Sequence, residues 1–155
     1  MTSRGRPASK RGRGVRALED EAQAALQRTA DRLLQGVAAL VKPAGLSPPQ
    51  YSVLRILRAA RAEGLACREI AERMITRDPD ITRLLDRLED RGLVTRSRER
   101  ADRRVITARI TPDGRRILAA LDRPMAALQA RQLGCLGREG LKTLVGLLER
   151  TEKGE

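Results

Sequence analysis

The sequence predicts a mainly α-helical fold that carries one β-hairpin. Hydrophobic residues make up 41% of the 155 residues but aromatic residues only 1%, with Tyr51 as the single example. The core therefore has to be built from Leu, Ile, Val and Ala, which favours packed helices over a β-sandwich. The apolar residues recur mainly at intervals of three and four, the period of an α-helix. A chain of this length is expected to form one compact domain.

The first 16 residues are expected to form a disordered basic arm ahead of that domain, which spans residues 17–155. The arm mixes Arg, Gly, Ser and Pro, and it holds six basic residues but no acidic one. The whole chain has a net charge of +12, which favours a polyanionic partner such as nucleic acid or an anionic membrane surface. An unengaged solubilising tail and an Arg-rich transit peptide are alternative interpretations of this segment.

A long amphipathic helix is expected from Ala17 to about Val41. Its apolar stripe consists of Leu18, Ala22, Leu26, Leu33, Val37 and Leu40. Pro43 and Gly45 end this helix. Ser47 begins a second one, because its hydroxyl can cap free amides and the two prolines that follow suit a first turn. The residues that face inward on the second helix are Tyr51, Leu54, Leu57 and Ala60.

Two short helices are expected near Arg68–Met74 and near Pro79–Arg91, and their separation is typical of a helix-turn-helix. The buried stripe of the second consists of Ile81, Leu84, Leu85 and Leu88. The opposite face then carries Thr82, Arg83, Asp86 and Arg87. Asp78 is expected to cap this helix and Gly92 to end it.

A two-stranded β-hairpin should follow, with strands in Leu93–Arg98 and Val105–Ile110, which are rich in β-branched residues. The intervening ERADRR is polar and short, as expected for a hairpin tip. Thr111 and Pro112 begin the next helix, which Pro124 should kink or divide. Its apolar side consists of Ile117, Leu118, Leu121, Met125 and Leu128. A last helix carries Leu141, Leu144, Val145 and Leu148.

Residues 68–116, REIAERMITRDPDITRLLDRLEDRGLVTRSRERADRRVITARITPDGR, resemble the MarR (multiple antibiotic resistance regulator) family of bacterial transcription factors. The strongest parts are ITRLLDRLEDRGLV, which matches the recognition helix and first wing strand, and the DRR of Asp102–Arg104. Ile110, Thr111 and Gly114 match the family's Leu-Thr-x-x-Gly pattern. The order of the flanking helices extends the likeness to residues 17–150. The turn at residues 75–78 departs from the family, which often has Gly and Ser there.

The resemblance implies a winged helix-turn-helix with a two-stranded β-wing, flanked by N- and C-terminal dimerisation helices. Residues 47–110 would form the DNA-binding module, and residues 17–42 and 112–151 the dimer helices. The apolar faces of those helices exceed what one small domain needs, which also favours two-fold pairing. No cysteine lies near the start of the first helix, where peroxide-sensing members carry theirs.

The candidate DNA-binding residues are Arg68, Arg77, Asp80, Thr82, Arg83, Arg87, Arg100, Asp102, Arg103 and Arg104. Arginine can bind guanine in the major groove through two hydrogen bonds, and threonine can contact a thymine methyl or a phosphate. Arg68 and Arg77 lie near helix amino termini, where phosphate contacts are expected. The helix arginines could instead pair with the neighbouring acids Asp86, Glu89 and Asp90 on a solvated face.

At the hairpin tip, arginine is drawn to the negative potential of a narrow minor groove. The resemblance assigns this contact to Arg104, with Asp102 holding an arginine in position, and a merely soluble turn is the alternative. The family also implies a small aromatic or anionic effector that releases DNA. Tyr51 and Arg55 fall near its expected site, although Tyr51 can equally be a core residue.

Catalysis is not expected, because no nucleophile with a base and no paired carboxylates are visible. The chain has no histidine, and Cys67 and Cys135 resemble neither a disulfide framework nor a zinc site, so no metal or cofactor is expected. Cys67 could be a redox switch or a small buried residue. No apolar run approaches the roughly 18 residues of a membrane span, and the bacterial cytoplasm, with association to the nucleoid through DNA, fits best.

The leading hypothesis is a homodimeric, sequence-specific repressor of an inverted-repeat operator, relieved by a small molecule. Repression itself follows from family habit. An architectural protein with little sequence preference is the first alternative, supported by the charge and the arm. A module whose basic face meets an acidic protein is the second. The ratio of operator to random-sequence affinity separates the first two, and an absence of duplex binding would favour the third.

Overall fold

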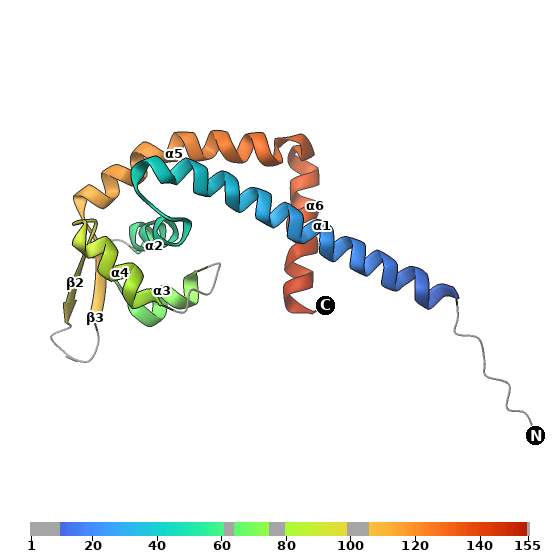
Figure 1. Ribbon diagram of the computed structural model, residues 1–155, viewed down its shortest axis with the longest axis horizontal. Coiled ribbons are helices and arrows are strands. Elements are labelled where there is room, and N and C mark those ends of the chain that lie inside the picture. Colours follow the sequence, from blue (N-terminus) through green and yellow to red (C-terminus); the bar gives the residue numbers. More distant parts are fainter. Residues whose placement is uncertain (1–9, 61–63, 75–79, 99–105, 155) are drawn as a thin grey trace, which may run out of the picture. The chain divides into compact units, whose positions relative to one another are not determined.

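The computed structural model describes residues 10–60, 64–74, 80–98 and 106–154, with side chains from residue 17 onward except that of Arg98. Internal contacts divide the chain into two units, residues 1–35 and residues 36–155. In the described part, helices dominate and one small sheet is present (Figure 1). None of the described helices is long and apolar enough to cross a membrane.

The first unit contains most of helix α1 (Lys10–Val41), which begins at Lys10 and not at the predicted Ala17. The predicted start was wrong because extending an existing helix costs little per residue, and Lys and Arg are good helix formers. The arm that we predicted for residues 1–16 is thus helical from Lys10, and residues 1–9 lie outside the described part. Leu18, Leu26 and Leu34 of this unit are exposed.

The second unit begins with the end of α1, followed by a 3-10 turn, η1 (Lys42–Ala44), and helix α2 (Pro48–Ala59). Gly45 ends the turn with φ 68°, as its predicted role requires. Ser47 caps α2 in a capping box: Gln50 N–H donates to Ser47 Oγ at 3.4 Å, and Ser47 N–H donates to Gln50 Oε1 at 3.0 Å. Both predicted boundaries are confirmed.

Helices α3 (Cys67–Arg73) and α4 (Ile81–Asp90) form the predicted helix-turn-helix. The cap of α4 is Asp80 and not Asp78, and the start predicted near Pro79 is too early. A capping carboxylate has to reach the amide three residues on, and Asp80 Oδ1 accepts a hydrogen bond from Arg83 N–H at 3.0 Å. Gly92, with φ 68°, follows α4 as predicted. Residues 75–79, which join the helices, lie outside the described part.

The wing is part of a three-stranded antiparallel sheet, whereas we predicted two strands. Strands β2 (Val94–Arg98) and β3 (Ile106–Ile110) pair as expected, and β1 (Leu65–Ala66) pairs with the other edge of β3 to give the order β1-β3-β2. Two residues are too few for a strand to show an alternating pattern. The hairpin tip, residues 99–105, lies outside the described part.

Helix α5 (Pro112–Leu133) runs without interruption through Pro124. Of the two effects that we predicted for this proline, a kink or a division, the division is therefore wrong. Pro124 lies on the exposed side. The buried side, formed by Leu118, Leu121, Met125 and Leu128, holds both halves against the core. A 3-10 turn, η2 (Gly134–Leu136), leads to the last helix, α6 (Gly137–Lys153).

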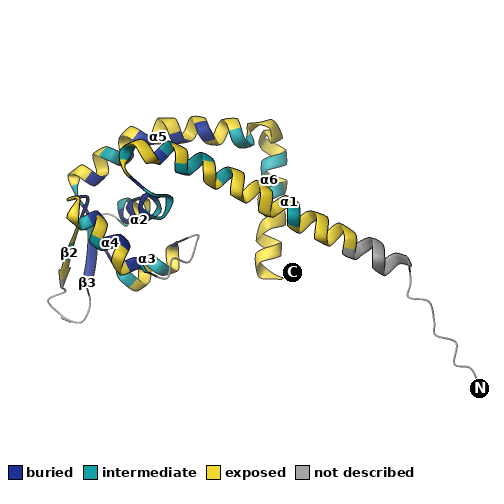
Figure 2. Cartoon of the chain, viewed as in Figure 1, coloured by how far each residue is buried: buried dark blue, intermediate teal, exposed yellow. Residues whose placement is uncertain are grey.

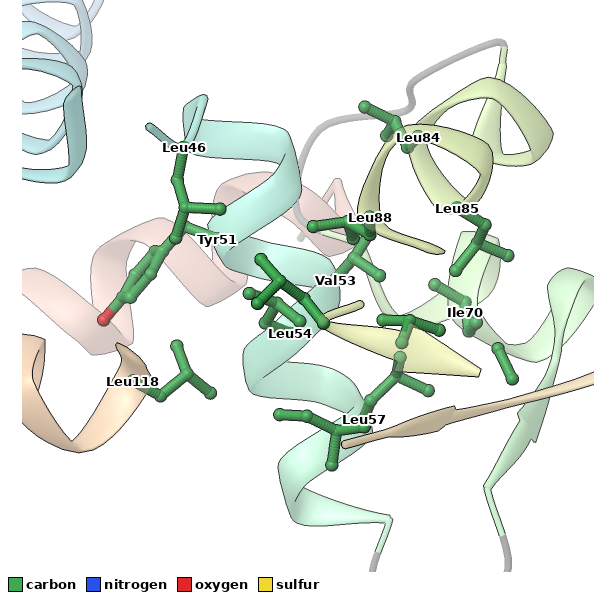
Figure 3. Packing of buried hydrophobic residues seen from close by; sticks show 14 of the residues in the cluster. Leu46, Tyr51, Val53, Leu54, Leu57, Ile70, Leu84, Leu85, Leu88 and Leu118 are labelled. Atoms are coloured by element: carbon green, nitrogen blue, oxygen red, sulfur yellow. The ribbon is translucent and has the colours of Figure 1, made fainter. Parts of the chain in front are cut away.

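The core of the second unit lies around α2, as Figure 3 shows. Leu54 and Leu57 of α2 meet Ile70 of α3, Leu88 of α4 and Leu118 of α5, and each is at most 1% exposed. Full burial of one such side chain stabilises the fold by about 1.5–3 kcal/mol. In Figure 2 burial is concentrated in α2, β3 and the inner sides of α4 and α5, whereas α6 is mostly exposed.

Candidate nucleic-acid interface

Helix α4 presents one apolar and one polar side, as its sequence predicts. Ile81, Leu84, Leu85 and Leu88 are buried. Thr82, Arg83 and Arg87 are exposed. The exposed residues belong to the face that a recognition helix turns toward a major groove.

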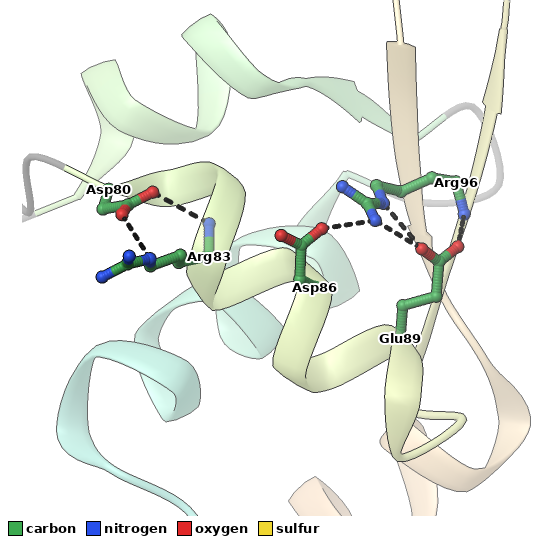
Figure 4. Close-up of polar contacts among 5 residues, drawn as sticks. All are labelled: Asp80, Arg83, Asp86, Glu89 and Arg96. Atoms are coloured by element: carbon green, nitrogen blue, oxygen red, sulfur yellow. Dashed lines mark hydrogen bonds and ion pairs between the residues drawn. The ribbon is translucent and has the colours of Figure 1, made fainter.

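Arg83 is connected to the cap of its own helix. Asp80 uses one carboxylate oxygen for the backbone N–H of Arg83 and lies, with the other, 3.2 Å from Arg83 Nε (Figure 4). The Arg83 side chain is still 76% exposed. Exposed ion pairs contribute about 0–1 kcal/mol, so the contact with Asp80 holds the Arg83 guanidinium only weakly. Asp80 therefore caps the start of α4 and leaves the Arg83 side chain accessible.

Sequence reasoning missed Arg96 of β2, which binds both Asp86 and Glu89 of α4 (Figure 4). Arg96 Nη2 lies 2.6 Å from Asp86 Oδ1 and 2.6 Å from Glu89 Oε2. Arg96 Nε donates to Glu89 Oε2 at 2.8 Å, and Arg96 N–H donates to Glu89 Oε1 at 3.0 Å. The hydrogen bond to Glu89 raises the pKa of Arg96 above its ordinary value, which means that this contact favours the charged guanidinium.

Asp86 and Glu89 thus take a partner from the wing, not from the helix arginines that we considered as the alternative. The regular spacings that predict ion pairs apply within one helix or between paired strands. They do not connect a helix carboxylate to a strand residue beyond a turn, so the sequence did not reveal the contacts of Arg96 with Asp86 and Glu89. Arg91 also points elsewhere: its guanidinium donates to the carbonyl oxygens of Gly45 and, at 3.0 Å, of Ala44. The end of α4 is therefore tied to the turn between α1 and α2.

The other predicted DNA contacts are only partly described. Arg68, at the start of α3, is exposed and pairs with Glu72 at 2.9 Å. That pair is highly exposed, at 90% and 62% for the two side chains, so it leaves Arg68 accessible to a phosphate. Arg77, Arg100, Asp102, Arg103 and Arg104 lie outside the described residues, and their roles stay predictions.

The two predicted effector-binding residues differ in burial. Tyr51 is 5% exposed and belongs to the core, which was the alternative interpretation of this residue. Arg55 is exposed, with its Cζ 5.8 Å from the centre of the Tyr51 ring. A pocket of about 240 Å³ lies beside it, lined by Ser52, Arg55, Ile56, Ala59 and Arg73. The pocket combines two cationic groups, one hydroxyl and an apolar wall, and Tyr51 is not among its lining residues.

Curated relatives of this chain are transcriptional regulators. The chain is 30% identical over 122 residues to the HTH-type transcriptional repressor MdtR of Bacillus subtilis, which covers 79% of this chain and 77% of that protein. It is 39% identical over 77 residues to the HTH-type transcriptional regulator TtmR of Methylorubrum extorquens. That second match covers 50% of this chain but only 38% of the length of TtmR.

Solved structures similar to this chain include transcription factors as well. A MarR transcription factor from Planctomyces limnophilus is 42% identical, with a TM-score of 0.67 over 84% of this chain and 94% of that one. CouR from Rhodococcus jostii RHA1 is 30% identical, with a TM-score of 0.74 over 86% of this chain and 93% of that one. The sequence model of the MarR family matches residues 46–106, from the turn before α2 to the start of β3. The chain belongs to the MarR family and is a DNA-binding transcription regulator.

Proposed function

We propose that this chain is a sequence-specific repressor that binds an inverted-repeat operator as a homodimer and is released by a small anionic molecule. The observation that carries the proposal is the exposed face of α4, where Thr82, Arg83 and Arg87 lie opposite the buried stripe. Arg83 and Arg87 are four residues apart and so share one side of the helix. Each can discriminate guanine from another base by about 1–3 kcal/mol.

Contacts to the DNA phosphates and to the minor groove complete the proposed interface. Arg68 and Arg77 would bind phosphates and set the register of the protein on the duplex. Arg100, Arg103 and Arg104 would enter the minor groove from the wing, with Asp102 holding one of them in place. Asp80 would act indirectly, because its carboxylate already contacts the backbone and side chain of Arg83.

The exposed apolar surface supports a dimer. In α6 and the turn before it, Leu136, Val145, Leu147 and Leu148 are 43%, 52%, 53% and 37% exposed. A hollow of about 750 Å³ on this helix is lined partly by Leu141 and Val145. Leaving such a surface in water costs about 25 cal/mol per Å² of apolar area. Two-fold pairing covers it and implies operator half-sites about one helical turn apart.

The pocket beside α2 supports a small-molecule effector. Arg55 and Arg73 can pair with a carboxylate, and Ile56 and Ala59 offer an apolar wall to a hydrocarbon or aromatic body. The related CouR has been crystallised bound to p-coumaroyl-CoA. The related MdtR is named as a transcriptional repressor, which supports repression as the direction of regulation.

The test is fluorescence anisotropy at physiological salt, with a duplex selected by the protein from a random pool and a shuffled control. We expect a preference of about a thousandfold or more and two chains per site. Equal affinity for both duplexes would instead identify an architectural protein, the second candidate, which the charge of +12 favours.

Replacing Arg83 tests base reading, and Arg116 supplies a matched control. Both arginines pair with an acid three residues earlier, and their side chains are 76% and 77% exposed. Arg83→Ala should lower affinity for the selected duplex by about tenfold or more and leave the shuffled duplex nearly unaffected. Arg116→Ala should leave the affinity for the selected duplex and the affinity for the shuffled duplex unchanged. An equal loss on both duplexes for Arg83→Ala would disprove its role as a base reader.

A further inference from the structure

Burial alone does not fix the rotation of α4 about its axis. Its stripe of Ile81, Leu84, Leu85 and Leu88 packs on the core, but hydrophobic contact is non-directional. Base reading is directional, and a recognition group has to be held within about 0.5 Å and about 10–20° of its productive geometry. A directional contact from a neighbouring element is therefore required.

Arg96 provides such a contact from the wing. Its guanidinium binds the carboxylates of Asp86 and Glu89 together, and its backbone N–H donates to the second oxygen of Glu89. The Arg96 side chain is 22% exposed, so these charge-assisted bonds are partly shielded from water. The planar guanidinium fixes the angle between the two carboxylates, which a lysine ammonium cannot do.

Asp86 connects this ion pair to the residues that we propose read bases. On a helix with 3.6 residues per turn, Asp86 lies on the same side as Arg83 and immediately precedes Arg87. Figure 4 shows Arg83 and Asp86 on consecutive turns, with Arg96 reaching Asp86 and Glu89 from the strand. A rotation of α4 that displaced Arg83 would have to stretch the contacts between Arg96 and both carboxylates.

We propose that Arg96 is the positioning residue that sets the rotation of α4 at which Arg83 and Arg87 reach their bases. This inference rests on the function proposed above. Arg96 also offsets one of the two negative charges of Asp86 and Glu89, which would otherwise repel DNA phosphates more strongly. That electrostatic effect is independent of sequence, whereas positioning affects only the preferred site, so the two roles are separable.

Arg96→Lys separates them, because it keeps the charge and removes the two-carboxylate geometry. We expect affinity for the selected duplex to fall by about tenfold, equivalent to about 1.4 kcal/mol, while affinity for the shuffled duplex stays within about twofold. An equal loss on both duplexes would overturn the inference in favour of electrostatics alone. An unchanged preference would overturn it as well.

Arg58→Lys is the matched control for general destabilisation. Arg58 also binds a carboxylate with two nitrogens, at 2.8 and 2.9 Å from Asp122, and its side chain is 33% exposed. It joins α2 to α5 and not to the recognition helix. Thermal unfolding should report similar small losses for both variants, whereas only Arg96→Lys should lower the preference. A lowered preference in both variants would assign the effect to stability and overturn the inference.

A double-mutant cycle supplies the last distinction. Glu89→Gln keeps the shape of Glu89 but weakens its bonds to Arg96, so its effect on the preference should not add to that of Arg96→Lys. Additive effects would overturn the inference, because the two residues would then act separately. An unaltered chain that bound both duplexes equally would overturn the proposed function, and this inference with it.

Discussion

Helices α4 and α6 are both amphipathic, but the apolar side of α4 is buried within the chain whereas that of α6 is not. Four residues of the ten-residue α4 are buried, and ion pairs with Arg96 tie it to the wing. In the single chain none of the 17 residues of α6, all of which the structure describes, is buried. An amphipathic pattern therefore shows that a face needs cover, but not whether the same chain supplies it. For α6 we propose a second copy.

A charge on the exposed apolar side of α6 should produce the largest effect. Val145→Glu should leave the fold of the monomer intact, because Val145 is already 52% exposed, but should separate the two copies. Losing two-point attachment to the operator should weaken binding by about a hundredfold or more. Sedimentation velocity measures the first effect, and anisotropy with the selected duplex measures the second.

Lys153→Gln is the control, since it changes the net charge by the same amount at an exposed position of the same helix. It should leave the sedimentation coefficient unchanged. A Val145→Glu protein that still sedimented as a dimer would show that α6 is not the covered face. The exposure of the apolar side of α6 would then need an explanation other than a second copy of the chain.

The space around single glycines also differs between the DNA-binding region, which is tightly packed at Gly114, and α6, which is open at Gly146. A Cβ at Gly114 would lie 2.4 Å from the carbonyl oxygen of Leu93 and 2.8 Å from Ile110 Cγ1, where α5 starts against the wing. Gly114→Ala should therefore destabilise the protein by about 1–3 kcal/mol. At Gly146 of α6, by contrast, a Cβ meets nothing within 4 Å.

Gly146→Ala should leave the free energy of unfolding unchanged or raise it by up to about 1 kcal/mol, since alanine favours a helix interior. Urea titrations of both variants at one protein concentration measure the difference. If Gly114→Ala proved as stable as the unaltered chain, the close approach of α5 to Leu93 would not constrain the wing. A large loss for Gly146→Ala would instead place that glycine inside the proposed dimer contact.

Features set by neighbours along the chain could be predicted from the sequence. The helix cap at Ser47, the buried stripe of α4 and the turn at Gly92 each depend on residues within a few positions, and all three predictions are confirmed. The Thr-x-x-G pattern also has a local cause. Thr111 caps α5, because its hydroxyl oxygen accepts a hydrogen bond from the N–H of Gly114 at 3.1 Å.

Features set by distant residues could not be predicted. Strand β1 exists because Leu65 and Ala66 pair with Ala108 and Thr107, far along the chain. The Arg96 ion pairs require the wing to fold back beside α4.

One local feature was also misplaced, the cap of α4. Two aspartates, Asp78 and Asp80, lie near the start of this helix, and only the position of the first helical residue decides which of them is the cap.

The smallest expected effect concerns the pair of Arg58 and Asp122, which is more exposed than that of Arg96. The hydrogen bond from Arg58 lowers the pKa of Asp122 below its ordinary value of 3.8. The stabilisation is therefore fully present above that value and is lost as the pH falls through the lowered pKa of the folded state. Asp122→Asn should reduce stability slightly at pH 7, and its difference from the unaltered chain should shrink below about pH 4.

Urea titrations between pH 2 and 7 test this, with Arg58→Gln as the partner variant. Both variants should remove the same pH-dependent contribution, and the double variant should remove no more, because one contact cannot be lost twice. Added salt should also reduce the contribution, since Asp122 is 52% exposed. A difference that stayed constant down to pH 2 would mean that the effect of Asp122→Asn does not depend on the ionisation of Asp122, which would disprove the role proposed for its charge. The different exposure of this pair and of the Arg96 ion pairs would then not explain how the two contacts differ in strength.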